Sequence, residues 1–158
     1  MPDFALTEPE RRLLQALHDR GLRFLIVGLG AALIEGAPVA TLDVDLWIER
    51  VDDPRLPEAV TSVGGFWVSG FGVQPPAFGG DGLERLDVVL TVHGLGSFEE
   101  EYAGAIPREI DGVPVRVLPL NRIVVSKRAT NRPKDRAALP ILEATLLARQ
   151  DNGGDTQG

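Results

Sequence analysis

The chain contains no cysteine, so neither a disulfide framework nor a thiolate metal site is available to it. No apolar run approaches the roughly 20 residues that a membrane-spanning helix needs. The first residues also lack the basic and apolar regions of a signal peptide. We therefore expect a cytoplasmic protein without a membrane partner.

Lysine is scarce, because Lys127 and Lys134 stand against fourteen arginines. The net charge of −7 predicts a surface that does not attract nucleic acid in general. Both lysines lie in one short segment, VVSKRATNRPKDRAAL. A lysine is a compact point charge suited to a phosphate, whereas arginine prefers planar, bidentate contacts. The segment is therefore either a phosphate-binding element or a solvated basic helix face.

The length of 158 residues, with 44% hydrophobic and 25% charged residues, is typical of one soluble globular domain. We expect this domain to cover residues 1–149 and a disordered tail to follow over 150–158, where glycines stand among polar residues. The glycine- and proline-rich stretch 69–82 predicts a long loop. Loops of this length often cover functional sites. Thr7 with Glu10 forms a capping box that predicts the start of a helix, and Asp111-Gly112 between short alternating runs predicts a hairpin over 106–117. Pro140 is expected to break or bend a C-terminal helix.

The most informative stretch is FLIVGLGAALIEGAPVATLDVDLWIE, residues 24–49. It predicts an apolar strand, a glycine turn, a short helix and a second strand over 41–48. Strand alternation places Asp43 and Asp45 on one face together with Thr41 and Trp47. The other face, expected to be buried, carries Leu42, Val44, Leu46 and Ile48. Two adjacent carboxylates repel each other unless a cation lies between them, and hard oxygen ligands are what Mg²⁺ prefers.

A third acid, Asp87, lies inside an otherwise apolar strand predicted over 83–92. Aspartate disfavours strands, and a half-buried carboxylate is costly unless it is paired or bound to a metal. With Asp43 and Asp45, it indicates a shared metal site on two strands. The alternative is three ordinary solvated acids.

The turn Gly28-Leu29-Gly30 follows a strand and precedes a helix, as the dinucleotide-binding fingerprint does. That fingerprint needs a third glycine where this chain has Leu33. The two aspartates that follow are typical of a different class of phosphate site.

These motifs resemble those of the nucleotidyltransferase superfamily, which includes DNA polymerase β and kanamycin nucleotidyltransferase. Val27-Gly28 is similar to the start of its glycine motif, Asp43-Val44-Asp45-Leu46 to its paired acids, and Asp87 to its third carboxylate. The segment LPLNRIVVSKRATNRPKDRAAL is similar to one found in a small bacterial branch of abortive-infection toxin-like proteins. The resemblance covers most of residues 22–143.

The resemblance implies an α/β (α+β) fold with a mixed sheet flanked by helices and further C-terminal helices. It implies a Mg²⁺-dependent nucleotidyltransferase, with two ions, that moves a nucleoside monophosphate from a nucleoside triphosphate to an unknown hydroxyl acceptor: a small molecule, RNA or protein. Asp43, Asp45 and Asp87 would bind metal and act in catalysis together with Lys127. The implied nucleotide-binding residues are Gly28, Leu29, Gly30, Thr41, Lys134 and Asp135.

Two positions depart from the family pattern. Leu29 stands where the family has glycine or serine, and Val39 stands where it commonly has arginine. They favour an alternative in which the chain is a degenerate nucleotidyltransferase that binds nucleotide or a partner without turnover. A further alternative is an interaction protein, one half of a toxin–antitoxin pair.

Overall fold

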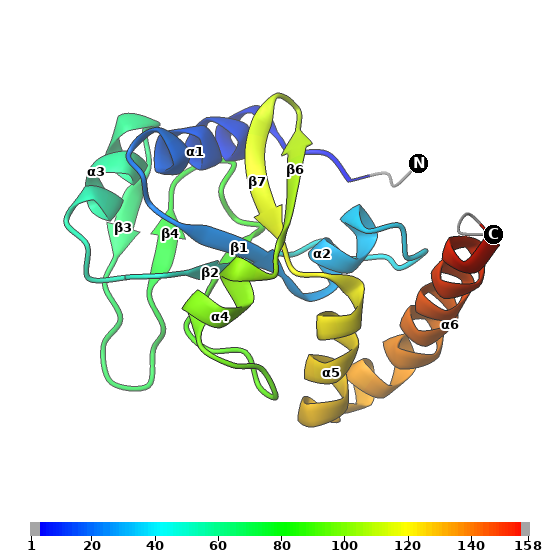
Figure 1. The fold of residues 1–158 in the computed structure, drawn as a ribbon. Coiled ribbons are helices and arrows are strands. Elements are labelled where there is room, and N and C mark those ends of the chain that lie inside the picture. Colours follow the sequence, from blue (N-terminus) through cyan, green and yellow to red (C-terminus); the bar gives the residue numbers. More distant parts are fainter. Residues whose placement is uncertain (1–3, 156–158) are drawn as a thin grey trace.

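The structure, a computed structural model, describes residues 4–155, with side chains as far as Asp151. Its centre is a five-stranded mixed sheet with the strand order β5-β2-β1-β7-β6, and β3 and β4 form a separate two-stranded sheet (Figure 1). The strands are β1 (Phe24–Val27), β2 (Val44–Ile48), β3 (Phe66–Val68), β4 (Ala77–Gly79), β5 (Leu86–Val89), β6 (Ile106–Ile110) and β7 (Val113–Val117).

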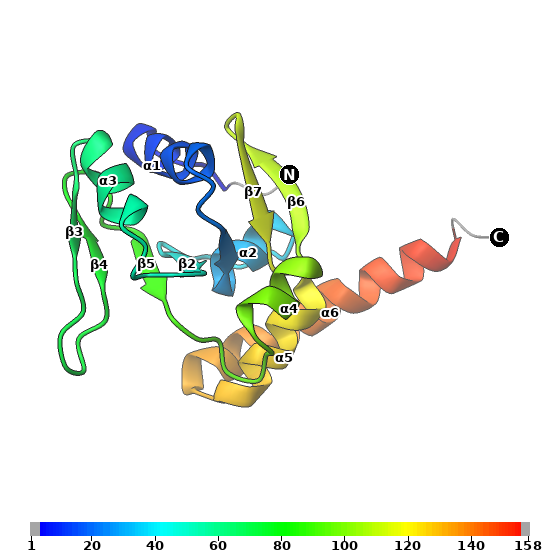
Figure 2. The ribbon, with the colours of Figure 1, turned by 60° about the vertical axis from the view of Figure 1, so that its left-hand side comes forward.

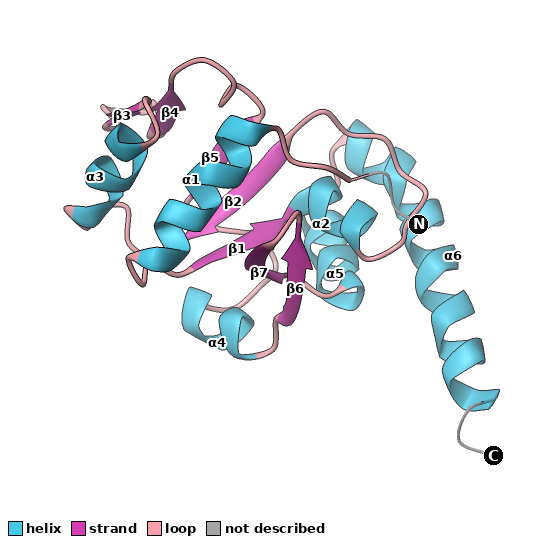
Figure 3. Ribbon diagram, turned by 90° about the horizontal axis from the view of Figure 1, so that it is seen from above, coloured by secondary structure: helices cyan, strands magenta, loops and turns pink. Residues whose placement is uncertain are grey.

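Helices cover both faces of the five-stranded sheet. They are α1 (Glu8–Asp19), α2 (Gly28–Ile34), α3 (Arg55–Ser62), α4 (Phe98–Ala103), α5 (Leu120–Thr130) and α6 (Pro133–Asp155). Helix α1 lies above the sheet beside α3, whereas α4 and α5 lie below it (Figures 1 and 3). Helix α6 packs on α5 and then extends away from the sheet (Figure 2).

The central strand β1 is buried at all four positions, as its sequence FLIV requires for a strand covered on both faces. Helix α1 begins with the capping box of Thr7 and Glu10, which satisfies two backbone N–H groups at its first turn. Three buried leucines of this helix, Leu13, Leu14 and Leu17, belong to the hydrophobic core. These elements form the rigid frame on which the candidate site is built.

The second strand is shorter than the sequence predicts, because it begins at Val44 and not at Thr41. The Thr41 hydroxyl accepts a hydrogen bond from the Asp43 backbone N–H at 3.2 Å, a local bond that competes with strand pairing. Leu42, expected on the buried face, is 82% exposed. Trp47, expected on the open face with the acids, is buried and meets Phe98 of α4 at 5.6 Å between ring centroids.

The stretch 69–82, predicted as a long loop, is the loop of a β-hairpin together with its second strand, β4. Strands β3 and β4 pair antiparallel, and Trp67 lies opposite Phe78 with their rings 5.4 Å apart. At the hairpin tip Phe71 is 87% and Val73 is 98% exposed. The glycines and prolines therefore mark the tip and flanks of a projecting hairpin.

The C-terminal half follows the predicted hairpin but not the predicted helix ends. Asp111 and Gly112 both have positive φ, 50° and 83°, as a two-residue turn of the primed type requires, and β6–β7 extends the sheet as expected. Helix α6 continues through Pro140 without ending there. It reaches Asp155, so residues 150–155 of the expected disordered tail are helical, and 156–158 lie outside the described residues. Within residues 4–155 no helix is both long and apolar enough to cross a bilayer.

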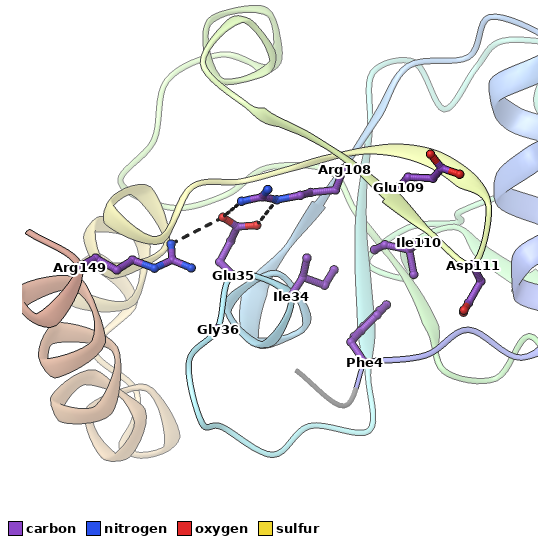
Figure 4. A pocket seen from close by; sticks show the side chains of 9 residues that line it. All are labelled: Phe4, Ile34, Glu35, Gly36, Arg108, Glu109, Ile110, Asp111 and Arg149. Atoms are coloured by element: carbon purple, nitrogen blue, oxygen red, sulfur yellow. Dashed lines mark hydrogen bonds and ion pairs between the residues drawn. The ribbon is translucent and has the colours of Figure 1, made fainter. Parts of the chain in front are cut away.

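Helix α2 is fixed at its C-terminal end by a buried acid. Glu35 follows its last residue and accepts two hydrogen bonds from Arg108 of β6, both at 3.0 Å. Arg149 of α6 approaches the same carboxylate at 3.7 Å. Figure 4 shows these three side chains meeting at the edge of a pocket of about 430 Å³. The cluster joins three elements, and one of them, α2, begins at the glycine turn.

Candidate active site

Asp45 and Asp87 are brought together by the pairing of β2 with β5. The two strands are parallel, and Asp45 lies directly opposite Asp87. Neighbouring strands are about 4.8 Å apart, and opposite residues in a parallel pair point to the same face. Two acids separated by 42 positions along the chain, 87 minus 45, therefore share one small area of the sheet.

The glycine turn lies against the same area. Val27, the last residue of β1, pairs with Asp45, and Gly28 follows with φ +69°. A Cβ atom at Gly28 would lie 2.5 Å from the Asp45 carboxylate, so no other residue fits without displacement. Leu29 is half-buried and packs against the hydrophobic core. Its bulk is therefore accommodated by the core.

Five acids are buried in the described chain, and each forms an ion pair with an arginine. The pairs are Glu10 with Arg85, Glu35 with Arg108, Asp53 with Arg55, Glu101 with Arg122 and Asp135 with Arg132. Within residues 4–155, the side chains of Asp45 and Asp87 take part in no hydrogen bond or ion pair. Burial raises the pKa of Asp45, and the nearby charge of Asp87 raises it further. Burial followed by the charge of Asp43 raises the pKa of Asp87. These acids are held close together without an ion-pair partner among the described residues.

Both lysines of the chain lie close enough to Asp45 for their charges to act on it. The positive charges of Lys127 and Lys134 each act to lower the pKa of Asp45, against the larger effect of burial. Lys134 also opposes the raised pKa of Asp87. The fold therefore gathers the only lysines in the chain beside the acids that the sequence singles out.

Asp135 holds Lys127 in place. Its carboxylate is 1% exposed and accepts hydrogen bonds from Lys127 Nζ at 3.1 Å and from the Thr130 hydroxyl at 2.6 Å. It also accepts bonds from the backbone N–H and the Nε of Arg132, at 3.2 and 2.8 Å. These donors hold the pKa of Asp135 well below its usual range although burial opposes them. Asp135 thus orients Lys127 from below instead of facing the open side.

The contact of Arg132 with Asp135 has one signal in the sequence: Arg132 lies three residues before Asp135, at the start of α6. The bend that allows the contact is at Asn131, whose φ of 50° is left-handed and ends α5. Asparagine tolerates this conformation better than most residues. The helix junction therefore folds back so that α6 presents Asp135 to α5.

The donor set suits a hard cation, since two unpaired carboxylates face each other at the paired strands. Asp43 is exposed and precedes β2, where the Thr41 hydroxyl holds its backbone. Among the described residues, no group of three or more His, Cys, Asp or Glu side chains is arranged to hold a metal ion. Asp45 and Asp87 are paired across the strands, and the charge of Asp43 acts on both of them from the residue that precedes β2.

Two hollows accompany these residues. One, of about 460 Å³, is formed by the segment just before Asp43 and by the end of α2; its lining residues are Leu33, Val39, Ala40, Thr41 and Leu42. The other, of about 320 Å³, lies at the Asp135 cluster and is lined by His93, Ala129, Thr130 and Arg132. No motif in the sequence singles out His93.

No protein-family model matches the chain, and no curated protein matches it. Two solved structures resemble it in fold. The solution structure of the antibiotic-resistance factor ANT(2'')-Ia superposes with a TM-score of 0.57 at 19% sequence identity, covering 94% of this chain and 93% of that one. The crystal structure of ANT(2'')-Ia in complex with adenylyl-2''-tobramycin gives a TM-score of 0.56 at 20% identity, covering 88% of each chain.

These neighbours are nucleotidyltransferase-fold proteins, and the likeness spans nearly the whole of both chains. The expected fold class is confirmed: the chain has a mixed sheet flanked by helices, similar to a nucleotidyltransferase structure.

Proposed function

We propose that the chain is a Mg²⁺-dependent nucleotidyltransferase that moves a nucleoside monophosphate from a nucleoside triphosphate to a hydroxyl acceptor. The observation that carries this proposal is the pairing of Asp45 with Asp87 beside Gly28, with neither carboxylate neutralised within the described chain. The five acids that are buried in the described chain each have an arginine partner, whereas half-buried Asp45 and exposed Asp87 have none. The nucleotidyltransferase-like fold supports the same reaction class.

Asp45 and Asp87, together with Asp43, would hold the magnesium ions. When bound, Mg²⁺ would neutralise phosphate oxygens and the charge on departing pyrophosphate. Its binding also removes the repulsion that raises the pKa of the acids, so the free energy of metal binding includes relief of this strain.

The chain's own residues would divide the remaining tasks. Gly28 lets the turn approach the triphosphate through its backbone N–H groups. Lys127 and Lys134 would neutralise phosphate oxygens, with Lys127 oriented by Asp135. Asp87, the more exposed member of the pair, would accept the proton of the acceptor hydroxyl. The acceptor oxygen then bonds to the α-phosphorus as pyrophosphate leaves.

A small molecule is the acceptor class that the observations favour. The neighbour of similar length is in complex with an adenylylated form of tobramycin. RNA is disfavoured by the net charge of −7. A protein acceptor would show itself as labelled protein in the assay below.

The direct test is calorimetry with Mg²⁺ and α,β-methylene nucleoside triphosphates, in which the bond that must break is blocked. We expect binding to wild type and at least a tenfold loss in Asp45→Asn, because one carboxylate ligand is removed. Asp52→Asn is the matched control, since Asp52 is 75% exposed on the far end of the same segment. Unchanged affinity in Asp45→Asn would contradict the metal assignment.

A degenerate form of the same fold is the second candidate, and a specific observation favours it. The described residues form no three-acid group able to hold a metal. Such a protein would bind nucleotide or a protein partner without turnover, as one half of a toxin–antitoxin pair. Transfer of label from α-³²P nucleoside triphosphates to any acceptor in a cell extract would exclude it, and binding without transfer would support it.

A further inference from the structure

A small pocket at the other end of the central strand is lined by basic groups. Its volume is about 260 Å³, and its polar lining residues are His18, Arg23, Tyr102, Arg108 and Arg116. We call it the arginine–tyrosine pocket. None of the described residues lining it is an acid, although the chain carries 23 acids and a net charge of −7. The pocket of Figure 4, by contrast, has the three acids Glu35, Glu109 and Asp111 in its lining beside Arg108 and Arg149.

Two of its arginines are already neutralised. Arg23 makes two hydrogen bonds to Glu49, at 2.8 and 2.7 Å, and also contacts Glu99. Arg108 is bound to Glu35. These arginines shape the pocket but contribute little free charge to it.

Arg116 differs, because within residues 4–155 it has no carboxylate within ion-pair distance. Its guanidinium lies 4.8 Å from the centroid of the Tyr102 ring, and Arg23 lies 4.7 Å from the same centroid. Stacking on an aromatic ring holds the guanidinium plane while leaving its N–H donors available. The result is a fixed, charged fork of the kind that binds phosphate bidentately. His18, exposed in the last turn of α1, supplies a further polar group.

The pocket is separate from the acid site. Phe24, the first residue of β1, lines it, whereas Gly28 follows the last residue of the same strand. Four residue steps along a strand span about 13 Å. The volume is also below the roughly 300–1,000 Å³ of pockets that hold drug-sized ligands, so it suits a single phosphate group with a small body.

We propose that the arginine–tyrosine pocket binds the phosphate group of a small molecule. Arg116 is the principal contact, His18 assists it, and apolar and proline side chains form the remaining walls. The proposal is independent of the transfer reaction.

The test is a titration of the ¹⁵N-labelled full chain with inorganic phosphate, followed by amide chemical shifts at low ionic strength with chloride as the reference anion. We expect saturable shifts at Val115 and Arg116. Arg116→Gln should weaken binding at least tenfold, and His18→Gln two- to threefold. Arg128→Gln is the matched control, because Arg128 is 60% exposed on α5. It should leave the affinity unchanged.

Further arms separate the possible sources of phosphate. Lys134→Ala should not affect these shifts, because Lys134 belongs to the acid site. Glycerol 3-phosphate should bind at least as tightly as inorganic phosphate. Shifts confined to the Gly28 turn, unchanged affinity in both Arg116→Gln and His18→Gln, or tighter binding of a single-stranded RNA at the same amides would overturn the small-molecule proposal. If Arg116→Gln fails to fold, Arg116→Lys replaces it, because lysine keeps the charge but loses the planar fork. We expect its phosphate affinity to fall between those of wild type and a variant without the charge.

Discussion

Gly28 lies against the carboxylate of Asp45, and this contact limits what the turn can hold. Its backbone has a left-handed φ, and the space where a Cβ would project is already filled. The two constraints are separable, because Gly64 has a similar φ of +87° with nothing within 4 Å of its Cβ position. Substitution of Gly64 therefore measures the backbone cost alone and serves as the control for substitution of Gly28.

We expect Gly28→Ala to destabilise the fold and to abolish triphosphate binding. The left-handed backbone costs about 1–2 kcal/mol for alanine, and displacement of the Asp45 side chain adds to it. Gly64→Ala should show only the backbone cost and normal binding. Urea unfolding and calorimetry on both variants check this, and equal stability losses with binding retained in Gly28→Ala would contradict it.

Asp45 is expected to reduce stability until a metal is bound. Its raised pKa means that ionisation is less favourable in the folded state, so the cost appears as pH rises through the folded pKa. At pH 7 with EDTA, Asp45→Asn should therefore be more stable than wild type by less than about 1 kcal/mol, the scale of a partly exposed charge interaction.

The gain should vanish below the unfolded pKa of about 3.9, where both states are protonated. Added Mg²⁺ should stabilise wild type and not the variant. Thermal melts with and without EDTA give both comparisons. A destabilised Asp45→Asn at pH 7 would show that the acid is satisfied in the metal-free fold.

At the scale of elements, the junction of α5 and α6 is joined by two acid–base contacts of very different burial. Asp135 with Lys127 is buried, with side-chain exposures of 1% and 12%. Glu143 with Arg128, on the same two helices, is exposed at 44% and 60%. One helix pair therefore contains both a test contact and its control.

We expect Asp135→Asn to cost about 3 kcal/mol at pH 7, as when one partner of a buried pair is removed. Glu143→Gln should cost no more than about 0.5 kcal/mol. Because the pKa of Asp135 is lowered on folding, its contribution is fully present above about pH 3.9 and declines as pH falls below that value. Unfolding curves between pH 3 and 7 should show the gap in unfolding free energy between wild type and Asp135→Asn becoming smaller as pH falls. A gap that does not change with pH would argue against the charge-based explanation.

The anchor of α2 can be tested in the same manner. Glu35→Gln should lose about 2 kcal/mol, since two charge-assisted hydrogen bonds to Arg108 are weakened. Glu8→Gln, in an exposed pair with Arg11, should leave the free energy of unfolding nearly unchanged, because solvent screens this pair. Amide hydrogen exchange at the Gly28 turn should accelerate only in Glu35→Gln. Unchanged exchange at the Gly28 turn in Glu35→Gln would show that the Glu35 contacts do not stabilise the turn.

Much of the element pattern could be predicted from the sequence, and its errors have physical causes. The Asp111-Gly112 hairpin and the Thr7 capping box were predicted because both are local. The strand at Asp45 is three residues shorter than predicted, since alternation does not reveal the hydrogen bond from the Asp43 backbone N–H to the Thr41 hydroxyl. The burial of Trp47 depends on α4, whose own start signal, Ser97 before Glu100, was overlooked.

The candidate site could be predicted in part. Spacing alone singled out Asp45, Asp87 and both lysines, whereas the strand pairing that brings the two acids together is a long-range contact. The contact of Arg132 with Asp135 depends on the left-handed turn at Asn131, which no periodicity reports. Pairing between distant elements is decided by the whole core, and a local pattern cannot contain it.

At the scale of the molecule, the β3–β4 hairpin and helix α5 both project beyond the same face of the sheet (Figures 1 and 2). Helix α4 covers this face. Trp47 of β2 contacts Phe98 of α4 there, and Asp45, two residues before Trp47 on the same strand, points to the same face. Phe71 and Val73 at the hairpin tip are almost fully exposed. We propose that this segment serves as a lid over bound nucleotide.

The double variant Phe71→Ser/Val73→Ser tests the lid. Its unfolding free energy should change by no more than about 0.5 kcal/mol, because both side chains are solvated already. The KM for nucleoside triphosphate should rise severalfold, since the tip would no longer cover the substrate. Phe78→Ser, which removes a buried ring, should instead cost about 3 kcal/mol. An unchanged KM in the double variant would reject the lid.

The scarcity of lysine has a chemical consequence at the candidate site. Lys127 and Lys134 carry the only side-chain amines of the chain, and both lie beside the acids. Reductive methylation or an amine-reactive ester will therefore label, apart from the α-amino group, only this one area. Lys134 is exposed and should react first, while Lys127, hydrogen-bonded to Asp135, should react slowly. Mass spectrometry of the labelled chain, with and without Mg²⁺ and triphosphate, would map ligand occupancy on an otherwise unreactive protein.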